Sequence, residues 1–148
     1  MKKHLIIGNP ISHTLSPKLH NYWFEENGIS GKYDKVLLKE NEIESLIKKI
    51  KTKELHGMNV TVPYKQIVIP YLESLSETAK ITNSVNTIFN KDEKIYGDNT
   101  DVFGFQESLS NKNIDLKNKD VFIFGAGGVV SSIILALINL NIKKIYLS

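Results

Sequence analysis

The stretch HGMNVTVPYK, residues 56–65, decides how the chain is organised. Residues 56–62 predict a strand that ends at Pro63, and a helix is expected from Tyr64 onward. Lys65 therefore comes just past the carboxyl end of a strand, where ligands bind in open α/β sheets. Its ammonium can project into that crevice, although a solvated surface lysine is the simpler interpretation for one lysine among 19.

Two strands and two helices are expected upstream of this stretch. Residues 5–7 form a short apolar run that Gly8-Asn9-Pro10 breaks, and residues 33–38 predict a second strand. One helix is expected with Ser16 as its N-cap, and another over residues 41–51, capped by its first residue. The order strand, helix, strand, helix, strand favours a parallel α/β layer.

Downstream of the stretch, helices and strands continue to alternate. Residues 74–81 predict a helix, and residues 85–89 and 94–96 predict two strands joined by a turn. Another helix is expected over residues 100–110. The polar segment 111–119 is interpreted as a surface connection between two units.

A glycine-rich turn opens the last part of the chain. The apolar run 121–124 predicts a strand, Gly125-Ala126-Gly127-Gly128 follow it, and a helix is expected to about Leu140 before a strand over residues 143–147. Glycines in this context let backbone N–H groups and a helix N-terminus approach a pyrophosphate. Val130 stands at the third glycine of the G-x-G-x-x-G pattern, so the strand-to-helix turn of any α/β protein is the alternative.

Composition excludes several classes of protein and site. The chain has 148 residues, 41% of them apolar, and no cysteine, so disulfides, thiolate metal sites and cysteine nucleophiles are absent. All 19 basic residues are lysines, and the formal charge of +3 forms no nucleic-acid-binding stripe. No signal-peptide core or membrane span is present, so the cytoplasm is the default compartment. Four histidines without metal-type spacing are interpreted as structural or solvated: His4, His13, His20 and His56.

Three polar groups are candidates for a binding site. Asp101 ends the cluster Gly97–Asp101 at the start of a predicted helix, where it favours the helix dipole or holds a nearby ammonium oriented. Asn86 lies at a strand start, and Thr14 and Ser16 offer two hydroxyls at a helix N-terminus. Taken singly, such residues are more often caps or turn residues than ligands.

Taken in order, these segments resemble the shikimate dehydrogenase family. Five motifs carry the resemblance: residues 8–17 (GNPISHTLSP), residues 59–65 (NVTVPYK), residues 85–87 (VNT), residues 97–101 (GDNTD) and residues 125–128 (GAGG). They span the whole chain with the family's order and spacing. The resemblance implies NADPH-dependent, reversible reduction of 3-dehydroshikimate to shikimate, a step toward chorismate and aromatic amino acids.

The resemblance also implies an architecture. We expect an α/β fold in which an N-terminal, mostly parallel α/β substrate domain, residues 1–101, precedes the beginning of a Rossmann-type NADP-binding domain, residues 102–148. The expected partner is the small-molecule substrate, with no nucleic acid or membrane. The sequence is compatible with a homodimer but does not reveal the oligomeric state.

Roles for individual residues follow from the resemblance. It implies catalytic roles for Lys65 and Asp101, substrate contacts for Thr14, Ser16, Thr61, Lys65, Asn86 and Asp101, and cofactor contacts for Gly125, Ala126, Gly127, Gly128 and Val129. A ketone that receives a hydride needs a proton donor, which the Lys65 ammonium supplies. In a chain without arginine, the hydroxyls of Thr14 and Ser16 are expected to bind the substrate carboxylate.

Family members are nearly twice as long as this chain, so we expect a fragment with little or no dehydrogenase activity of its own. The residues that distinguish NADP from NAD are expected beyond Ser148. Two alternatives stay open: an NAD-linked quinate/shikimate dehydrogenase, and a non-catalytic shikimate-binding module.

Overall fold

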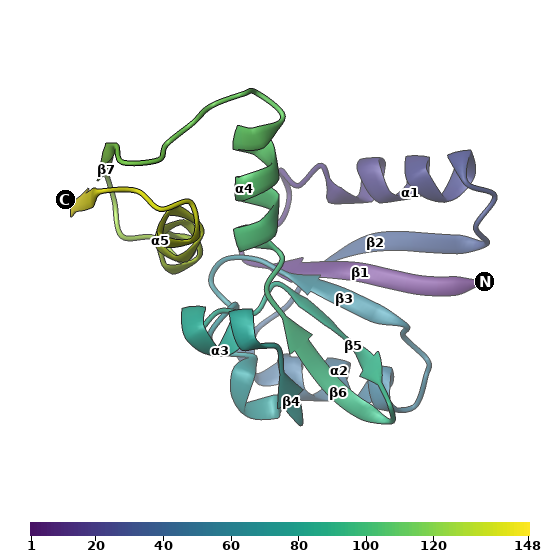
Figure 1. Ribbon diagram of the computed structural model, residues 1–148. Coiled ribbons are helices and arrows are strands. Elements are labelled where there is room, and N and C mark those ends of the chain that lie inside the picture. The colour runs from purple at the N-terminus through teal and green to yellow at the C-terminus, as the bar shows by residue number, and fades with distance from the viewer.

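The computed structural model describes all 148 residues and is built around a six-stranded sheet with the order β2-β1-β3-β5-β6-β4 (Figure 1). Its strands are β1 (Lys2–Gly8), β2 (Gly31–Leu37), β3 (Gly57–Val60), β4 (Ser74–Leu75), β5 (Thr87–Lys91) and β6 (Lys94–Asp98). The helices are α1 (Ser16–Glu26), α2 (Ile43–Lys51), α3 (Glu77–Thr82), α4 (Asp101–Ser110) and α5 (Val130–Asn139), with 3-10 helices η1 (Glu40–Glu42) and η2 (Ile69–Tyr71). No helix combines the length and hydropathy that a membrane crossing requires.

The sheet is mostly parallel. β1 pairs in parallel with both β2 and β3, and β4 pairs in parallel with β6, whereas β5 runs antiparallel to β3 and β6. The β5–β6 hairpin turns at Asp92 and Glu93, which both have positive φ angles, as tight hairpin turns require. The expected α/β class and the mostly parallel sheet are confirmed.

The alternation of side chains along β1 separates two apolar layers. Leu5 and Ile7 join the larger core, which contains the buried side of α2, whereas Ile6 joins a smaller cluster with Tyr33 and Phe24 of α1. Successive side chains of a strand point to opposite faces. The helices α1 and α2 therefore cover opposite faces of the sheet.

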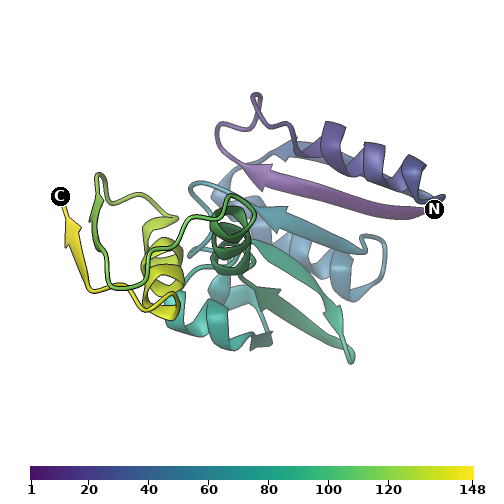
Figure 2. The same ribbon diagram turned by 45° about the horizontal axis from the view of Figure 1, so that its top comes forward.

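A second, two-stranded sheet pairs β7 (Asp120–Ile123) in parallel with β8 (Lys144–Leu147), and α5 connects the two strands. The helix α4 stands between the six-stranded sheet and α5 in both ribbon views (Figures 1 and 2). Three residues of α5 are buried: Ser132, Ala136 and Leu137. The strand–helix–strand unit that carries the glycine turn is thus held against α4.

The start of α1 differs from the expected one. Ser16 is not the N-cap but the first helical residue, because Leu15 already has helical backbone angles. The N–H of Ser16 donates to Oγ1 of Thr14 at 3.3 Å, so the Thr14 hydroxyl supplies the oxygen that was expected from Ser16. The second helix also begins differently, since η1 precedes it and α2 starts at Ile43.

The helix expected from Tyr64 onward is wrong. The structure has a series of turns over residues 62–68 and then η2. The carbonyl of Lys65 accepts the N–H of Val85 at 2.8 Å, while the N–H of Ile69 bonds to Gln66. The Lys65 carbonyl is thus paired with a distant N–H rather than with that of Ile69, and the regular helical ladder is interrupted at this point.

Two further boundaries differ. β3 ends at Val60 rather than at Pro63, and the expected helix over residues 74–81 begins with the short strand β4 before α3 starts. Ser76 caps α3 by accepting the N–H of Ala79 at 3.0 Å. The N-cap serine is the third residue of the predicted helix, so the helix starts later than the pattern indicated.

Candidate active site

Lys65 and Asp101 form an ion pair at the edge of the sheet. Lys65 lies in the turn after β3 and Asp101 is the first residue of α4, and 2.7 Å separate Nζ from Oδ2. The side chains are only 13% and 22% exposed. A partly desolvated pair is held more firmly than one on the surface. The carboxyl edge of β3 is therefore where the structure brings the two expected catalytic residues together.

Asn86 fixes the other oxygen of the Asp101 carboxylate. Its Nδ2 donates to Asp101 Oδ1 at 2.8 Å and to Thr100 Oγ1 at 3.0 Å, and its Oδ1 accepts the N–H of Thr100 at 3.0 Å. One carboxylate oxygen thus faces Lys65 and the other faces Asn86. The three residues form one hydrogen-bonded group, called here the Lys65–Asp101–Asn86 cluster.

Two residues behind this cluster escaped the sequence interpretation. Asn59 on β3 donates from Nδ2 to the carbonyl of Asn86 and to Thr87 Oγ1, both at 3.1 Å. The Tyr33 hydroxyl donates to Asn59 Oδ1 at 2.6 Å, and burial raises the pKa of Tyr33. An amide between the apolar residues 58 and 60 of a buried strand is the signal that could have revealed Asn59, because buried polar groups need partners.

Asn99 is a third residue that the sequence interpretation missed. It is 4% exposed, and its Oδ1 accepts the backbone N–H of Asp101 at 2.9 Å. This bond satisfies one of the free N–H groups at the start of α4. Asn99 therefore helps to fix the backbone that carries the Asp101 carboxylate.

Thr14 and Ser16 form a separate hydroxyl pair. Thr14 Oγ1 donates to Ser16 Oγ at 3.1 Å, in the segment that leads from β1 into α1. No hydrogen bond joins this pair to the Lys65–Asp101–Asn86 cluster. The structure thus brings the expected carboxylate-binding residues together with each other, at a helix N-terminus.

Thr61 lies where the ends of β1 and β3 come together. Its N–H donates to the carbonyl of Ile7 at 2.9 Å, and its hydroxyl makes no hydrogen bond within the protein. A Cβ at Gly8 would lie 2.5 Å from Thr61 Cγ2, so only glycine allows this close approach of the two strands. The free hydroxyl is available to a ligand.

The glycine turn between β7 and α5 has an open backbone. Gly125 has a φ of +102°, which L side chains rarely adopt, and Val129 is the N-cap of α5 without a side-chain cap. A Cβ at Gly127 or Gly128 would meet no atom within 4 Å. Free N–H groups of a helix N-terminus beside an open turn fit the phosphates of a dinucleotide.

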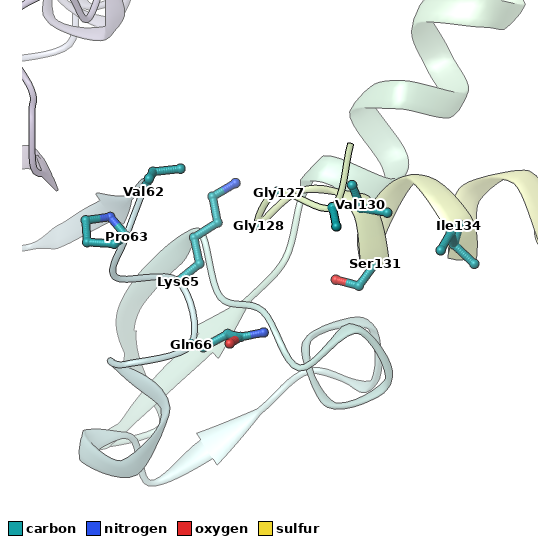
Figure 3. A pocket seen from close by; sticks show the side chains of 10 residues that line it. Val62, Pro63, Lys65, Gln66, Gly127, Gly128, Val130, Ser131 and Ile134 are labelled. Carbon is teal, nitrogen blue, oxygen red and sulfur yellow. The ribbon is translucent and has the colours of Figure 1, made fainter. Parts of the chain in front are cut away.

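A cavity of about 530 Å³ separates the glycine turn from Lys65 (Figure 3). Its lining includes Lys65 and Gln66 on one side, and Ala126, Gly127, Gly128 and Ser131 on the other. Gly125, Val129, Thr14, Ser16, Asn86 and Asp101 do not line it. The backbone of Ala126, Gly127 and Gly128 on one side would hold the phosphates of a dinucleotide, and the Lys65 ammonium lies on the other side of the same cavity. No three His, Asp or Glu side chains gather as metal ligands.

Comparison with known proteins agrees with these features. The family model of the shikimate dehydrogenase substrate binding domain matches residues 6–88. A shikimate dehydrogenase (NADP(+)) of Pelagibacter ubique is 56% identical over 147 residues, 99% of this chain and 56% of the relative. One of Clostridium beijerinckii is 42% identical over 96% of this chain and 53% of the relative. The chain thus spans about half the length of the curated relatives it matches.

Solved structures are similar over nearly the whole chain. Shikimate dehydrogenase 1 of Peptoclostridium difficile matches 99% of this chain and 56% of its own with a TM-score of 0.92 and 35% identity. The Thermus thermophilus enzyme, solved in complex with NADP(H) and shikimate, matches 99% of this chain and 56% of its own, with a TM-score of 0.90 and 28% identity. With the family model matching more than half of its residues, the chain belongs to the shikimate dehydrogenase family.

Proposed function

We propose that the protein is an NADP-dependent shikimate dehydrogenase that reduces 3-dehydroshikimate to shikimate and also catalyses the reverse reaction. The observation that carries the proposal is that Lys65, which is ion-paired with Asp101, lines one side of a cavity whose other side is formed by the glycine turn. Residues 1–101 would hold the substrate, and residues 102–148 would begin the dinucleotide-binding domain. The cytoplasm is the compartment we propose for this reaction.

Lys65 is proposed as the proton donor. Negative charge develops on the ketone oxygen during reduction, and a proton donor within hydrogen-bond reach of it lowers the barrier. Asp101 is the only hydrogen-bond acceptor of the Lys65 Nζ, so two of its N–H groups remain for the substrate. In the reverse direction the amine takes the proton back. When bound, the dinucleotide supplies or receives the hydride.

The substrate carboxylate is proposed to bind Thr14 and Ser16. Because Thr14 Oγ1 donates to Ser16 Oγ, the Ser16 proton is free to point outward to an anion. The helix N-terminus adds a favourable dipole. This chain has no arginine, so no guanidinium can bind the substrate carboxylate. Two hydroxyls at a helix N-terminus would bind it instead.

Ring hydroxyls of the substrate are proposed to contact Thr61, Asn86 and Asp101. The Thr61 hydroxyl has no partner within the protein, whereas both Nδ2 protons of Asn86 are already donated. Asn86 would therefore exchange its bond to Thr100 for one to a ring hydroxyl. Each such bond discriminates against analogues that lack the group.

The cofactor is proposed to be held by the backbone of Gly125, Ala126, Gly127, Gly128 and Val129. The open turn and the N-terminus of α5 are the supporting observations. The N–H of Gly125 already donates to the carbonyl of Ser148 at 2.8 Å, so the N–H groups that follow it in the turn would bind the phosphates.

The test uses the chain itself and a chimera. In the chimera, the part of the Pelagibacter ubique relative that follows the matched region is joined after Ser148. We expect the 148-residue chain to bind shikimate in calorimetry without dehydrogenase activity, and the chimera to reduce NADP with shikimate. In the chimera, Lys65→Met should lower kcat by about 10²-fold or more. The exposed Lys80→Met is the matched control and should leave kcat unchanged.

Three outcomes would contradict the proposal. A Lys65→Met chimera that keeps a kcat within about threefold of the parent would exclude proton donation by Lys65. A chimera that folds and binds shikimate but has no activity would favour a non-catalytic binding module. A chimera that prefers quinate to shikimate would assign the substrate of the quinate/shikimate dehydrogenase alternative, because this chain supplies the substrate contacts.

A further inference from the structure

Asn99 connects the catalytic pair to the helix of the glycine turn. Its Oδ1 holds the N–H of Asp101 at 2.9 Å, and its Nδ2 lies 2.9 Å from Oγ of Ser132 on α5. Asn99 is 4% exposed and Ser132 is 0% exposed. Residues 1–101, which are proposed to hold the substrate, are called here the substrate side of the molecule. A hydrogen bond between two buried side chains, 33 residues apart in sequence, therefore joins the substrate side to α5.

The remaining bonds of Asn99 anchor it on the substrate side. Its Nδ2 also lies 3.0 Å from Thr82 Oγ1 at the end of α3 and 3.0 Å from the carbonyl of Ser84. An amide nitrogen has two protons, so three acceptors compete for them. Only one of the three acceptors, Ser132, belongs to the part of the chain that carries the glycine turn.

Ser132 comes four residues after Gly128 and is the third residue of α5, within its first turn. A constraint on Ser132 therefore fixes where the N-terminus of α5 and the glycine turn stand relative to Lys65 and Asp101. The separation between the two sides of the cavity, one lined by Lys65 and the other by Gly127, depends on this placement. Hydride transfer requires the reacting atoms to be held within a few tenths of an ångström of a productive geometry.

We propose that Asn99, through its hydrogen bond to Ser132, is a positioning residue that sets the distance between the Lys65–Asp101 pair and the cofactor-binding turn. The catalytic consequence rests on the proposed dehydrogenase function. The placement itself is a property of the folded chain and can be measured without any ligand.

The test uses Ser132→Ala, with Thr82→Val as its matched control. Each variant removes one of the three acceptors of Asn99 and leaves two for its two protons, so neither orphans a buried N–H group. Ser132→Ala removes the bond to α5, and Thr82→Val removes a bond on the substrate side.

The chain has no cysteine, so a thiol-reactive spin label would modify only the two cysteines that are introduced for the experiment. Lys49→Cys on α2 and Asn139→Cys at the end of α5 are exposed positions on the two sides. We expect Ser132→Ala to shift or broaden the label-to-label distance by about 2 Å, and Thr82→Val to leave it unchanged. An unchanged distance in Ser132→Ala, or an equal change in both variants, overturns the proposal.

The chimera supplies the catalytic readout. Ser132→Ala should lower kcat roughly tenfold while the KM for shikimate stays within about twofold, because the substrate contacts are untouched. Thr82→Val should keep both values. A kcat of Ser132→Ala within about twofold of the parent overturns the positioning role. An inactive parent chimera would instead contradict the proposed function, and the distance measurement would still decide the placement.

Discussion

Residues 1–101 and residues 102–148 differ in how completely they bury their apolar side chains. The first region contains all 15 residues of the larger core cluster. In the second region, β7 and β8 contain no buried residue, and Phe122, Phe124 and Leu147 are 62%, 85% and 54% exposed. A two-stranded sheet is marginal by itself. The Lys65–Asp101 pair is therefore held by a complete core, whereas the glycine turn depends on how α5 packs against α4.

The sharpest way to test this difference is to remove one core side chain from each region. Ile50→Ala on α2, at a position with 0% exposure, should cost about 2–5 kcal/mol of the free energy of unfolding and weaken the whole chain. Leu137→Ala on α5, at 1% exposure, should release α5 and speed its amide exchange without unfolding residues 1–101. Urea unfolding combined with hydrogen exchange measures both effects. Global unfolding by Leu137→Ala would show that the two regions are one cooperative unit.

A smaller effect is expected when the Lys65–Asp101 pair, proposed as catalytic, is broken on the side of the complete core. Asp101→Asn keeps the size of the side chain and leaves the bond from the residue's own backbone N–H to Asn99 Oδ1, but removes the charge that faces Lys65. The kcat of the chimera should fall about 10²-fold, because the ammonium loses its orientation. Hydrogen exchange of β3 should stay as in the parent. Faster exchange throughout β3 would mean that the pair stabilises the fold rather than orienting the proton donor.

The smallest expected effect is a loss of stability in acid that is confined to the first region. Burial lowers the pKa of both His4 and His20 from the ordinary value of 6.5. The unfolded chain then binds protons more readily, so the contribution of these two residues to the free energy of unfolding is fully present above about pH 6.5 and decreases as the pH falls below it. His4→Leu should flatten this decline in urea unfolding between about pH 7.5 and pH 5.

The second region contains no histidine, so amide exchange in α5 provides the internal control. Once intrinsic exchange rates are corrected for pH, its protection should change less than that of β1. An equal loss of protection in α5 and β1 would contradict the assignment of the acid sensitivity to the first region.

The order of strands and helices was largely predictable from local patterns. The apolar run of residues 5–7, the Ser16-Pro17 start and the residues around 101 all lie in or next to the elements expected there. The absence of the helix expected after Tyr64 was not predictable, because the Lys65 carbonyl accepts the N–H of Val85, 20 residues further along. Local propensity contains no information about such a partner.

The candidate site shows the same division. Lys65, Asp101, Asn86 and the glycine turn were identified from motif resemblance, and the structure brings the first three into hydrogen-bonding contact. Asn59 and Asn99 were missed, because their roles depend on side chains that are distant in sequence. A buried amide is recognised as a positioning group only when its partners are known.

By itself, the sequence determined most of the elements, the residue types at the sheet edge and the family, because periodicity and motif spacing are local properties of the chain. Only the tertiary structure decided which groups meet: that Lys65 pairs with Asp101, that Asn86 takes the second carboxylate oxygen, and that Asn99 reaches Ser132 on α5. These contacts result from the pairing of β3 with β1 and β5 and from the packing of α5 on α4. Hydrogen bonds of this kind have ångström tolerances, which a spacing in sequence cannot specify.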